Sequence, residues 1–186
     1  METMLSLSHK QHLKILAGKS IETGLNSGKP ATATTKDLEG ALGQPGASFV
    51  TLMKHKQLRG CIGSLQAHQP LAADVMSNAY SAAFRDYRFS PLTDREFPEL
   101  VIKISVLSPE TPIVFVSEED LLQQIRPGID GLVLTEGRYR GTFLPSVWEQ
   151  LPEPVQFLRH LKQKAGLSAH YWSNTLEITR YTTDEF

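Results

Sequence analysis

Apolar residues recur three or four positions apart near the start of the chain and again after residue 70, which predicts two amphipathic helices. In the first helix, the recurring apolar positions are Leu13, Leu16, Ala17, Ile21 and Leu25. We expect Ser8 to cap its start and Gly28 to end it. The second helix should begin at Pro70, a residue that suits a first helical turn, and end near Asp86.

Six segments alternate apolar and polar residues with a period of two, which is typical of half-buried strands. These segments are 47–53, 58–65, 100–107, 129–135, 138–144 and 175–182. Shorter helices are expected at 36–42, 117–126, 145–151 and 155–165. Polar connections at 54–57 and at Glu136-Gly137 predict two hairpins. The mixture of helices and hairpin-linked strands favours an α+β fold, with a largely antiparallel sheet and flanking helices, over a doubly wound parallel sheet.

Composition places the chain among ordinary globular proteins. Of its 186 residues, 40% are hydrophobic and 21% are charged, and 19 basic against 20 acidic residues give a net charge of −1. Such a balance argues against a dedicated polyanion binder, so nucleic acid is not an expected partner. Apolar runs are too short to span a membrane, and the start lacks a signal-peptide pattern. We therefore expect a cytoplasmic protein whose residues 1–186 form one domain, with room for two lobes.

The chain holds one cysteine, Cys61. A single thiol excludes an internal disulfide framework and any site built from several thiolates of one chain, an iron–sulfur cluster included. The sequence lacks a phosphate-binding glycine loop, a dinucleotide-binding glycine turn, a nucleophile elbow and the His-Glu-x-x-His zinc pattern. We therefore predict no cofactor and no metal site.

The segment Leu58-Arg59-Gly60-Cys61-Ile62-Gly63 has the LRGCIG signature of the AMMECR-type domain family, which the chain resembles along nearly its whole length. Other blocks that resemble the family in the same order are Asn78-Ala79, Arg88-Phe89, Ile104-Ser105-Val106-Leu107 and Arg140-Gly141-Thr142-Phe143-Leu144-Pro145. The resemblance implies an α+β fold with a larger lobe, a smaller lobe and a cleft between them. It also implies an association with a Memo-type protein and a radical SAM protein, as for protein A of the AmmeMemoRadiSam system. It implies no established biochemical activity.

Around Cys61 the residue types support two interpretations. In an extended strand, Arg59 and Cys61 lie on one face, about 7 Å apart, and a guanidinium there would favour the thiolate. Gly60 and Gly63 would leave room beside the sulfur for a substrate or a partner's backbone. Alternatively, the thiol packs as a small apolar group, the glycines permit a bulge, and Arg59 fastens two elements by pairing with a carboxylate.

Asp86 and Arg88 lie where the second helix gives way to an irregular segment, a kind of segment that often carries function. In one interpretation, Asp86 accepts two contacts from Arg59 or Arg88 and orients a guanidinium towards an anionic ligand. In the other, Asp86 and Arg88 form a local ion pair that fixes the segment. Glu96 is adequately explained by a capping contact with Thr93.

Two functional hypotheses follow. We favour a non-catalytic binding module that presents the LRGCIG face to a partner, with the Memo-type and radical SAM proteins as candidates. The binding residues would be Arg59, Gly60, Gly63, Asp86 and Arg88. The alternative is an enzyme with Cys61 as the catalytic nucleophile, in a cleft with the three charged residues of that set. An isolated cysteine with no base tied to it by sequence is thin support for nucleophilic catalysis.

Overall fold

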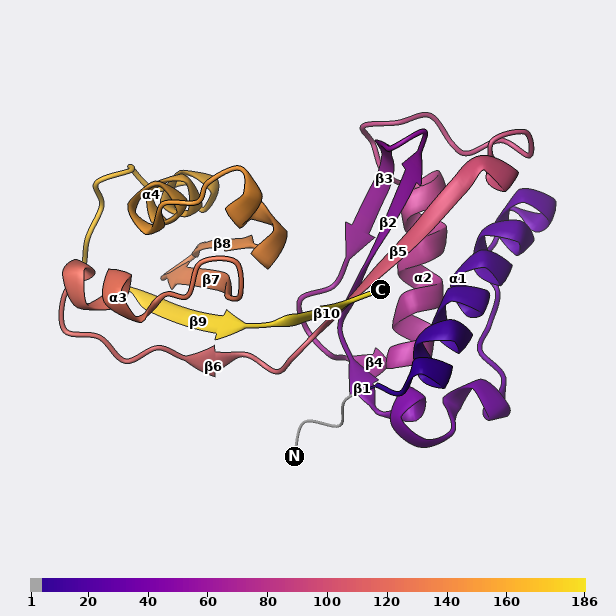
Figure 1. Ribbon diagram of the computed structural model, residues 1–186, viewed down its shortest axis with the longest axis horizontal. Helices are drawn as coiled ribbons and strands as arrows, with labels where there is room; N and C mark the ends of the chain where they lie inside the picture. The colour runs from indigo at the N-terminus through magenta and orange to yellow at the C-terminus, as the bar shows by residue number, and fades with distance from the viewer. Residues whose placement is uncertain (1–4) are drawn as a thin grey trace. The chain divides into compact units, whose positions relative to one another are not determined.

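The computed structural model describes residues 5–186, which form two compact units. The first unit comprises the chain up to Leu107 together with Asp184–Phe186, and the second is Ser108–Thr183. Helices and antiparallel strands make up both units, so the predicted α+β class is confirmed (Figure 1). The expectation of one sheet is wrong, because each unit has its own four-stranded sheet. Alternation identifies the buried face of a strand but carries no information on which strand lies beside it.

The sheet of the first unit has the strand order β10-β5-β2-β3. Its strands are β2 (Ser48–Lys54), β3 (Gln57–Gly63), β5 (Leu100–Leu107) and β10 (Thr183–Glu185), and a second, two-stranded sheet joins β1 (Pro45–Gly46) and β4 (Gln69–Pro70). Strand β2 runs antiparallel to both β3 and β5. The predicted strand 100–107 is confirmed, and the strands predicted at 47–53 and 58–65 are displaced by one or two residues at their ends.

Two long helices pack on one face of this sheet (Figure 1). They are α1 (Leu7–Ser27) and α2 (Leu71–Phe84), and short 3-10 helices occupy Thr35–Leu38, Gly40–Gly43 and Phe97–Glu99. Ser6, not Ser8, caps α1, because its side chain accepts the His9 N–H and satisfies a donor that the first turn leaves free. Gly28 ends α1 as predicted, in the left-handed conformation with φ 69°.

The hairpin between β2 and β3 sets the pairing register of the LRGCIG segment and so the directions of its side chains. Its two turn residues, His55 and Lys56, have positive φ values of 50° and 64°, as a tight hairpin turn requires. The pairing register then shifts, since Leu52 lies opposite Gly60 whereas Met53 lies opposite Leu58. The residue between them on β3, Arg59, is therefore the extra residue of a β-bulge, a device that re-aims a side chain.

The second unit has the strand order β6-β9-β7-β8. Its elements are β6 (Thr111–Pro112), α3 (Glu118–Gln124), β7 (Gly131–Glu136), β8 (Tyr139–Phe143), a 3-10 helix (Pro145–Glu149), α4 (Pro154–Lys164) and β9 (Glu177–Tyr181). Helix α4 packs its apolar side, including Phe157 and Leu161, into the core of this sheet. Trp148 stacks on Phe157 with ring centroids 3.8 Å apart and is buried in this core.

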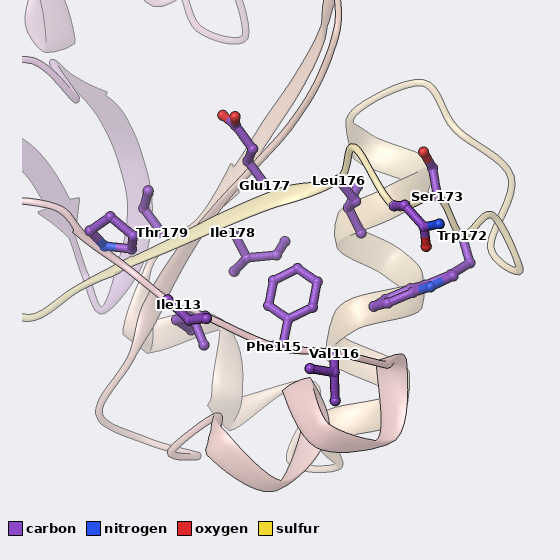
Figure 2. A pocket seen from close by; sticks show the side chains of 12 residues that line it. Ile113, Phe115, Val116, Trp172, Ser173, Leu176, Glu177, Ile178 and Thr179 are labelled. Carbon is purple, nitrogen blue, oxygen red and sulfur yellow. The ribbon is translucent and has the colours of Figure 1, made fainter.

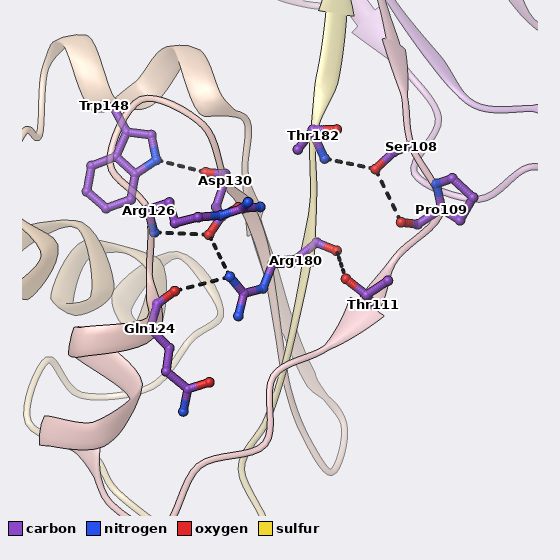
Figure 3. A network of polar contacts seen from close by, with 9 residues as sticks. All are labelled: Ser108, Pro109, Thr111, Gln124, Arg126, Asp130, Trp148, Arg180 and Thr182. Carbon is purple, nitrogen blue, oxygen red and sulfur yellow. Dashed lines mark hydrogen bonds and ion pairs between the residues drawn. The ribbon is translucent and has the colours of Figure 1, made fainter. Parts of the chain in front are cut away.

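A buried carboxylate, Asp130, joins several elements of the second unit (Figure 3). Its side chain accepts hydrogen bonds from Arg126 Nη2 at 2.6 Å and from Arg180 Nη1 at 3.3 Å. Its carbonyl oxygen accepts from Trp148 Nε1 at 2.7 Å. Two guanidinium groups offset the cost of burying this charge, so the network fixes the segment after α3 against β9.

Candidate functional site

Cys61 lies on β3, an edge strand of the first sheet. Its backbone N–H donates to Asp86 Oδ2 at 2.9 Å, and its carbonyl oxygen accepts from Arg88 Nη2 at 3.3 Å. These are the two backbone groups with which an additional strand would pair. Asp86 and Arg88 therefore close the sheet edge at the signature through side-chain contacts.

Asp86 and Arg88 also form an ion pair with each other. Arg88 donates from Nε to Oδ1 at 2.9 Å and from Nη2 to Oδ2 at 2.6 Å. The Asp86 side chain is only 2% exposed, whereas that of Arg88 reaches the surface. The hydrogen bonds from the Arg88 side chain, followed by the backbone N–H of Cys61, hold the pKa of Asp86 well below its usual range despite its burial. The sequence left open whether Asp86 orients an arginine towards a ligand or forms a local ion pair with Arg88. The structure contains the local ion pair.

Arg59 is bonded elsewhere. It donates from Nε to Glu96 Oε1 at 2.9 Å, from Nη2 to Glu96 Oε2 at 3.1 Å, and from Nη2 to the Ser90 carbonyl at 3.0 Å. Glu96 also accepts from the backbone N–H and hydroxyl of Thr93, as the capping interpretation predicted. The Arg59 contact, above all, lowers the pKa of Glu96 to about 2. Sequence reasoning identified the cap but missed the partner of Arg59.

One aromatic ring lies beside both ion pairs. The guanidinium carbons of Arg59 and Arg88 are 5.8 Å and 5.5 Å from the centroid of the Phe89 ring, a cation–π distance. The neighbouring Tyr87 points away from these contacts and is 94% exposed. The loop after α2 is therefore held in place by the contacts of Asp86 and Arg88, and it presents the exposed side chain of Tyr87 to solvent.

Among the described residues, Thr51 Oγ1 is the hydrogen-bond neighbour of the Cys61 thiol, at 3.2 Å. Cys61 itself is partly exposed. The guanidinium of Arg59 is bonded to Glu96, so it is not directed at the thiol as one of the two sequence interpretations required. The guanidinium whose charge reaches Cys61 is that of Arg88, which is paired with Asp86. Among residues 5–186, no histidine forms a hydrogen bond with Cys61; the two nearest in sequence contact other groups, His55 pairing with Glu99 and His68 with the Gln66 carbonyl.

Gly60 and Gly63 are packed against other groups. A Cβ atom on Gly60 would collide with the backbone carbonyl of Ala82 in α2, and one on Gly63 would collide with the Phe49 ring. These glycines therefore allow β3 to approach the helix on one face and Phe49 on the other. The room that the sequence interpretation assigned to a ligand is filled by the protein itself.

The face of the first sheet that points away from α1 and α2 contains the Cys61 thiol. Thr51 lies directly opposite both Cys61 and Lys103 in the register, so these three side chains form a row across β3, β2 and β5. We call this surface the signature face, which consists of Phe49, Thr51, Met53, Cys61, Val101 and Lys103. Val101 and Lys103 are exposed. Within the first unit, the described helices leave this face uncovered (Figure 1).

A second buried carboxylate, Asp74 in α2, escaped the sequence analysis. It accepts hydrogen bonds from Ser48 Oγ at 2.7 Å, Ser64 Oγ at 2.7 Å and Asn78 Nδ2 at 2.9 Å, among others. These contacts tie the start of β2 and the residue after β3 to the first turns of α2. Asp74 therefore positions the end of the signature segment rather than facing solvent. The spacing of Asp74 and Asn78 on one helix face is the sequence signal that could have revealed it.

Over the described residues, no group of three or more histidine, cysteine, aspartate or glutamate side chains is arranged to hold a metal ion. Within that same range, none of the helices combines the length and apolar character needed to cross a bilayer.

Comparison with known proteins places this geometry in a family context. The AMMECR1 family model matches residues 15–186. A protein of Methanosarcina acetivorans is 35% identical over 168 residues, covering 88% of this chain and 83% of the relative. A protein of Thermotoga maritima is 36% identical over 141 residues, covering 75% of this chain and 76% of the relative. The crystal structure of an uncharacterized protein from Pyrococcus horikoshii has a TM-score of 0.88 at 30% identity, covering 97% of this chain and 92% of that one.

Proposed function

The chain belongs to the AMMECR1 family, and on that premise we propose that it is a cytoplasmic, non-catalytic binding module. Its partner contact is the signature face together with the adjoining Tyr87 and Arg88. The partners are the Memo-type and radical SAM proteins of the AmmeMemoRadiSam system, which the resemblance of the LRGCIG segment suggests.

The observation that carries this proposal is the exposure of Tyr87 on a rigidly held loop. Its side chain is 94% exposed, although its two neighbours in sequence, Asp86 and Arg88, are bonded to the backbone of Cys61. An exposed aromatic side chain on an ordered backbone segment loses little conformational entropy on binding. Tyrosine and arginine are also among the residue types enriched at the energetic centres of protein interfaces.

The contacts around the signature favour a face over an edge as the binding surface. The N–H and carbonyl of Cys61 are already used by Asp86 and Arg88, so a partner strand cannot pair there without breaking both contacts. Arg59 and Arg88 each have a carboxylate partner, so covering this region does not strand an unpaired cation. Gly60 and Gly63 serve the module by setting the shape of β3.

The alternative function, an enzyme that uses Cys61, requires a base that activates the thiol. Within the described residues, Thr51 is the hydrogen-bond neighbour of the Cys61 sulfur, and the charged group that interacts with the thiol, the Arg88 guanidinium, cannot act as a base. A binding module needs no such base, and the two ion pairs and the two glycines of this region are explained by the shape that they give to its surface.

A calorimetric titration with the two partner proteins separates the two functions. We expect the wild-type chain to bind at least one of them with a Kd below tens of micromolar, about −6 kcal/mol or tighter, and Cys61→Ser to bind equally well. Absence of binding to both proteins would contradict the module. Retained binding with loss of the assembled system's activity in Cys61→Ser would show a chemical role for the thiol.

A further inference from the structure

The second unit contains an open groove of about 530 Å³ that is remote from the signature in sequence (Figure 2). One wall is the extended segment 112–116, which follows β6. The other wall is the first part of β9 with the loop that precedes it, residues 172–174 and 176–179. Both walls belong to the second unit.

The groove exists because the segment that follows β6 diverges from β9 at the edge of this sheet. Strand β6 pairs with β9 at Thr179 and Arg180, and the last backbone bond between the two segments runs from the Ile113 N–H to the Ile178 carbonyl at 2.9 Å. Beyond this point, within the described residues, the backbone contacts between the walls end. Since backbone groups of alternate residues point to the same side of an extended chain, the peptide groups of Phe115 face β9 as those of Ile113 do.

The outer side of segment 112–116 is already occupied by α3. The Val116 N–H donates to Asp120 Oδ2 at 2.9 Å, and the Val114 carbonyl accepts from Gln124 Nε2 at 2.8 Å. These contacts close the outer edge against strand addition, as charged and amide side chains do on other edge strands. The free backbone groups of the segment are therefore those that face the groove.

The lining of the groove is apolar and exposed. Val114 and Val116 are 84% and 91% exposed, far more than isolated valines in a stable strand. Between the walls, the rings of Phe115 and Trp172 lie with centroids 5.6 Å apart (Figure 2). A large apolar side chain placed here would cover the two rings, while the neighbouring residues of the same extended peptide would lie against the valines, whose side chains alternate with Phe115 along the segment.

The charge at the groove is acidic. Glu177 is the charged residue among those that line the groove, is exposed, and forms no ion pair within residues 5–186. The buried Lys162 lies beside the groove, with its Nζ 5.5 Å from the centroid of the Trp172 ring, but its charge is paired with Glu118 at 3.1 Å rather than with Glu177. The surface therefore complements a cationic ligand.

We infer that this groove binds an extended peptide segment of a partner protein, with a large apolar side chain on Phe115 and Trp172 and a basic side chain facing Glu177. A peptide fits better than a compact molecule because both walls are extended backbones and Phe115 presents its peptide groups between them. Backbone contacts would supply affinity and the two side chains would supply specificity, as in other peptide-binding sheet edges.

The test uses the full chain and a blocked model peptide, acetyl-Val-Lys-Trp-Lys-Val-amide, in an NMR titration of backbone amides. We expect saturable shifts confined to residues 113–116 and 172–179. Glu177→Lys should weaken binding at least about tenfold, and so should replacing both lysines of the peptide by glutamates. Glu153→Lys, an exposed charge reversal at the start of α4, should change nothing, which controls for net charge.

Three results would overturn the inference. The first is the absence of shifts in the groove up to about 2 mM peptide, where even a weak complex should form. The second is equal binding by Glu177→Lys and Glu153→Lys when both keep the wild-type amide spectrum elsewhere. The third is equally tight binding of acetyl-tryptophan-amide alone, which would make the groove a site for small aromatic molecules.

Discussion

Arg59 and Glu96, 37 residues apart in the chain, are joined by two hydrogen bonds of 2.9 Å and 3.1 Å. This pair fastens the bulge of β3 to the segment before β5. Since the side chains are mostly buried, the pair contributes to folding in a way that depends on the ionisation of Glu96.

The first prediction concerns acid stability. Folding lowers the pKa of Glu96 from 4.5 to about 2, so its contribution is present above pH 4.5 and is lost as pH falls towards 2. In Glu96→Gln this part of the acid dependence should vanish, at a cost on the order of 2 kcal/mol at neutral pH. Urea unfolding at several pH values measures both effects. An unchanged slope between pH 4.5 and pH 2 would show that the pair contributes no pH-dependent stability.

The second prediction concerns the closed edge of β3. Asp86→Ala removes the acceptor of the Cys61 N–H and leaves Arg88 unpaired, so we expect a loss of about 2–4 kcal/mol in the free energy of unfolding. The open edge should also increase self-association. Denaturation and light scattering measure the two consequences. Glu39→Ala, an exposed carboxylate of the same unit, is the control and should leave both unchanged. Equal behaviour of the two variants would contradict the edge-closing role.

The third prediction compares two glycines of the signature. Gly60→Ala directs a Cβ at the backbone carbonyl of Ala82, which cannot move without shifting α2, so a loss of about 3 kcal/mol or more is expected. Gly63→Ala meets the Phe49 ring at its first atom, Cγ, so Phe49 must adopt another χ1 rotamer; a side chain can do this without moving a helix, so the cost should be smaller, about 2 kcal/mol. Thermal unfolding of the two variants tests the order. The reverse order would mean that β3 is not held against α2 as described.

The fourth prediction concerns the thiol. Because Glu96 occupies Arg59, Arg59→Lys should change the rate of Cys61 alkylation by iodoacetamide by less than about twofold in the folded protein. Thr51→Val removes the polar neighbour at 3.2 Å and should change the rate more. Mass spectrometry of timed reactions gives both rates. A marked slowing in Arg59→Lys with no effect of Thr51→Val would restore an arginine-activated thiol.

Local patterns predicted much of the fold. The alternation along Leu100–Leu107 located β5 to the residue, and the alternation along β2 agrees with the structure, in which Val50 and Leu52 are buried on one face. Such patterns depend only on neighbours in sequence, which is why they can be read directly. The division of the strands between two sheets depends on contacts between distant residues, and no single segment encodes it.

The sequence identified most residues of the candidate site, but it did not identify which of them contact one another. Sequence reasoning selected Arg59, Cys61, Asp86 and Arg88, and the structure brings the last three together at one edge. The bulge at Arg59 breaks the period of two and directs this side chain to Glu96, which a regular strand would not predict. The partner of a buried arginine lies wherever the fold brings a carboxylate, so spacing along the chain cannot identify it.

The most direct test of the binding-module proposal is the affinity of two matched variants for whichever of the Memo-type and radical SAM proteins binds the wild-type chain. Tyr87→Ala removes an exposed side chain beside the signature face, and Ile15→Ala removes an exposed one on α1, the helix on the other side of the sheet. Both should leave thermal unfolding unchanged. We predict that Tyr87→Ala raises Kd at least about tenfold while Ile15→Ala leaves it unchanged. Equal affinities of the two variants, or a loss confined to Ile15→Ala, would contradict the proposed surface.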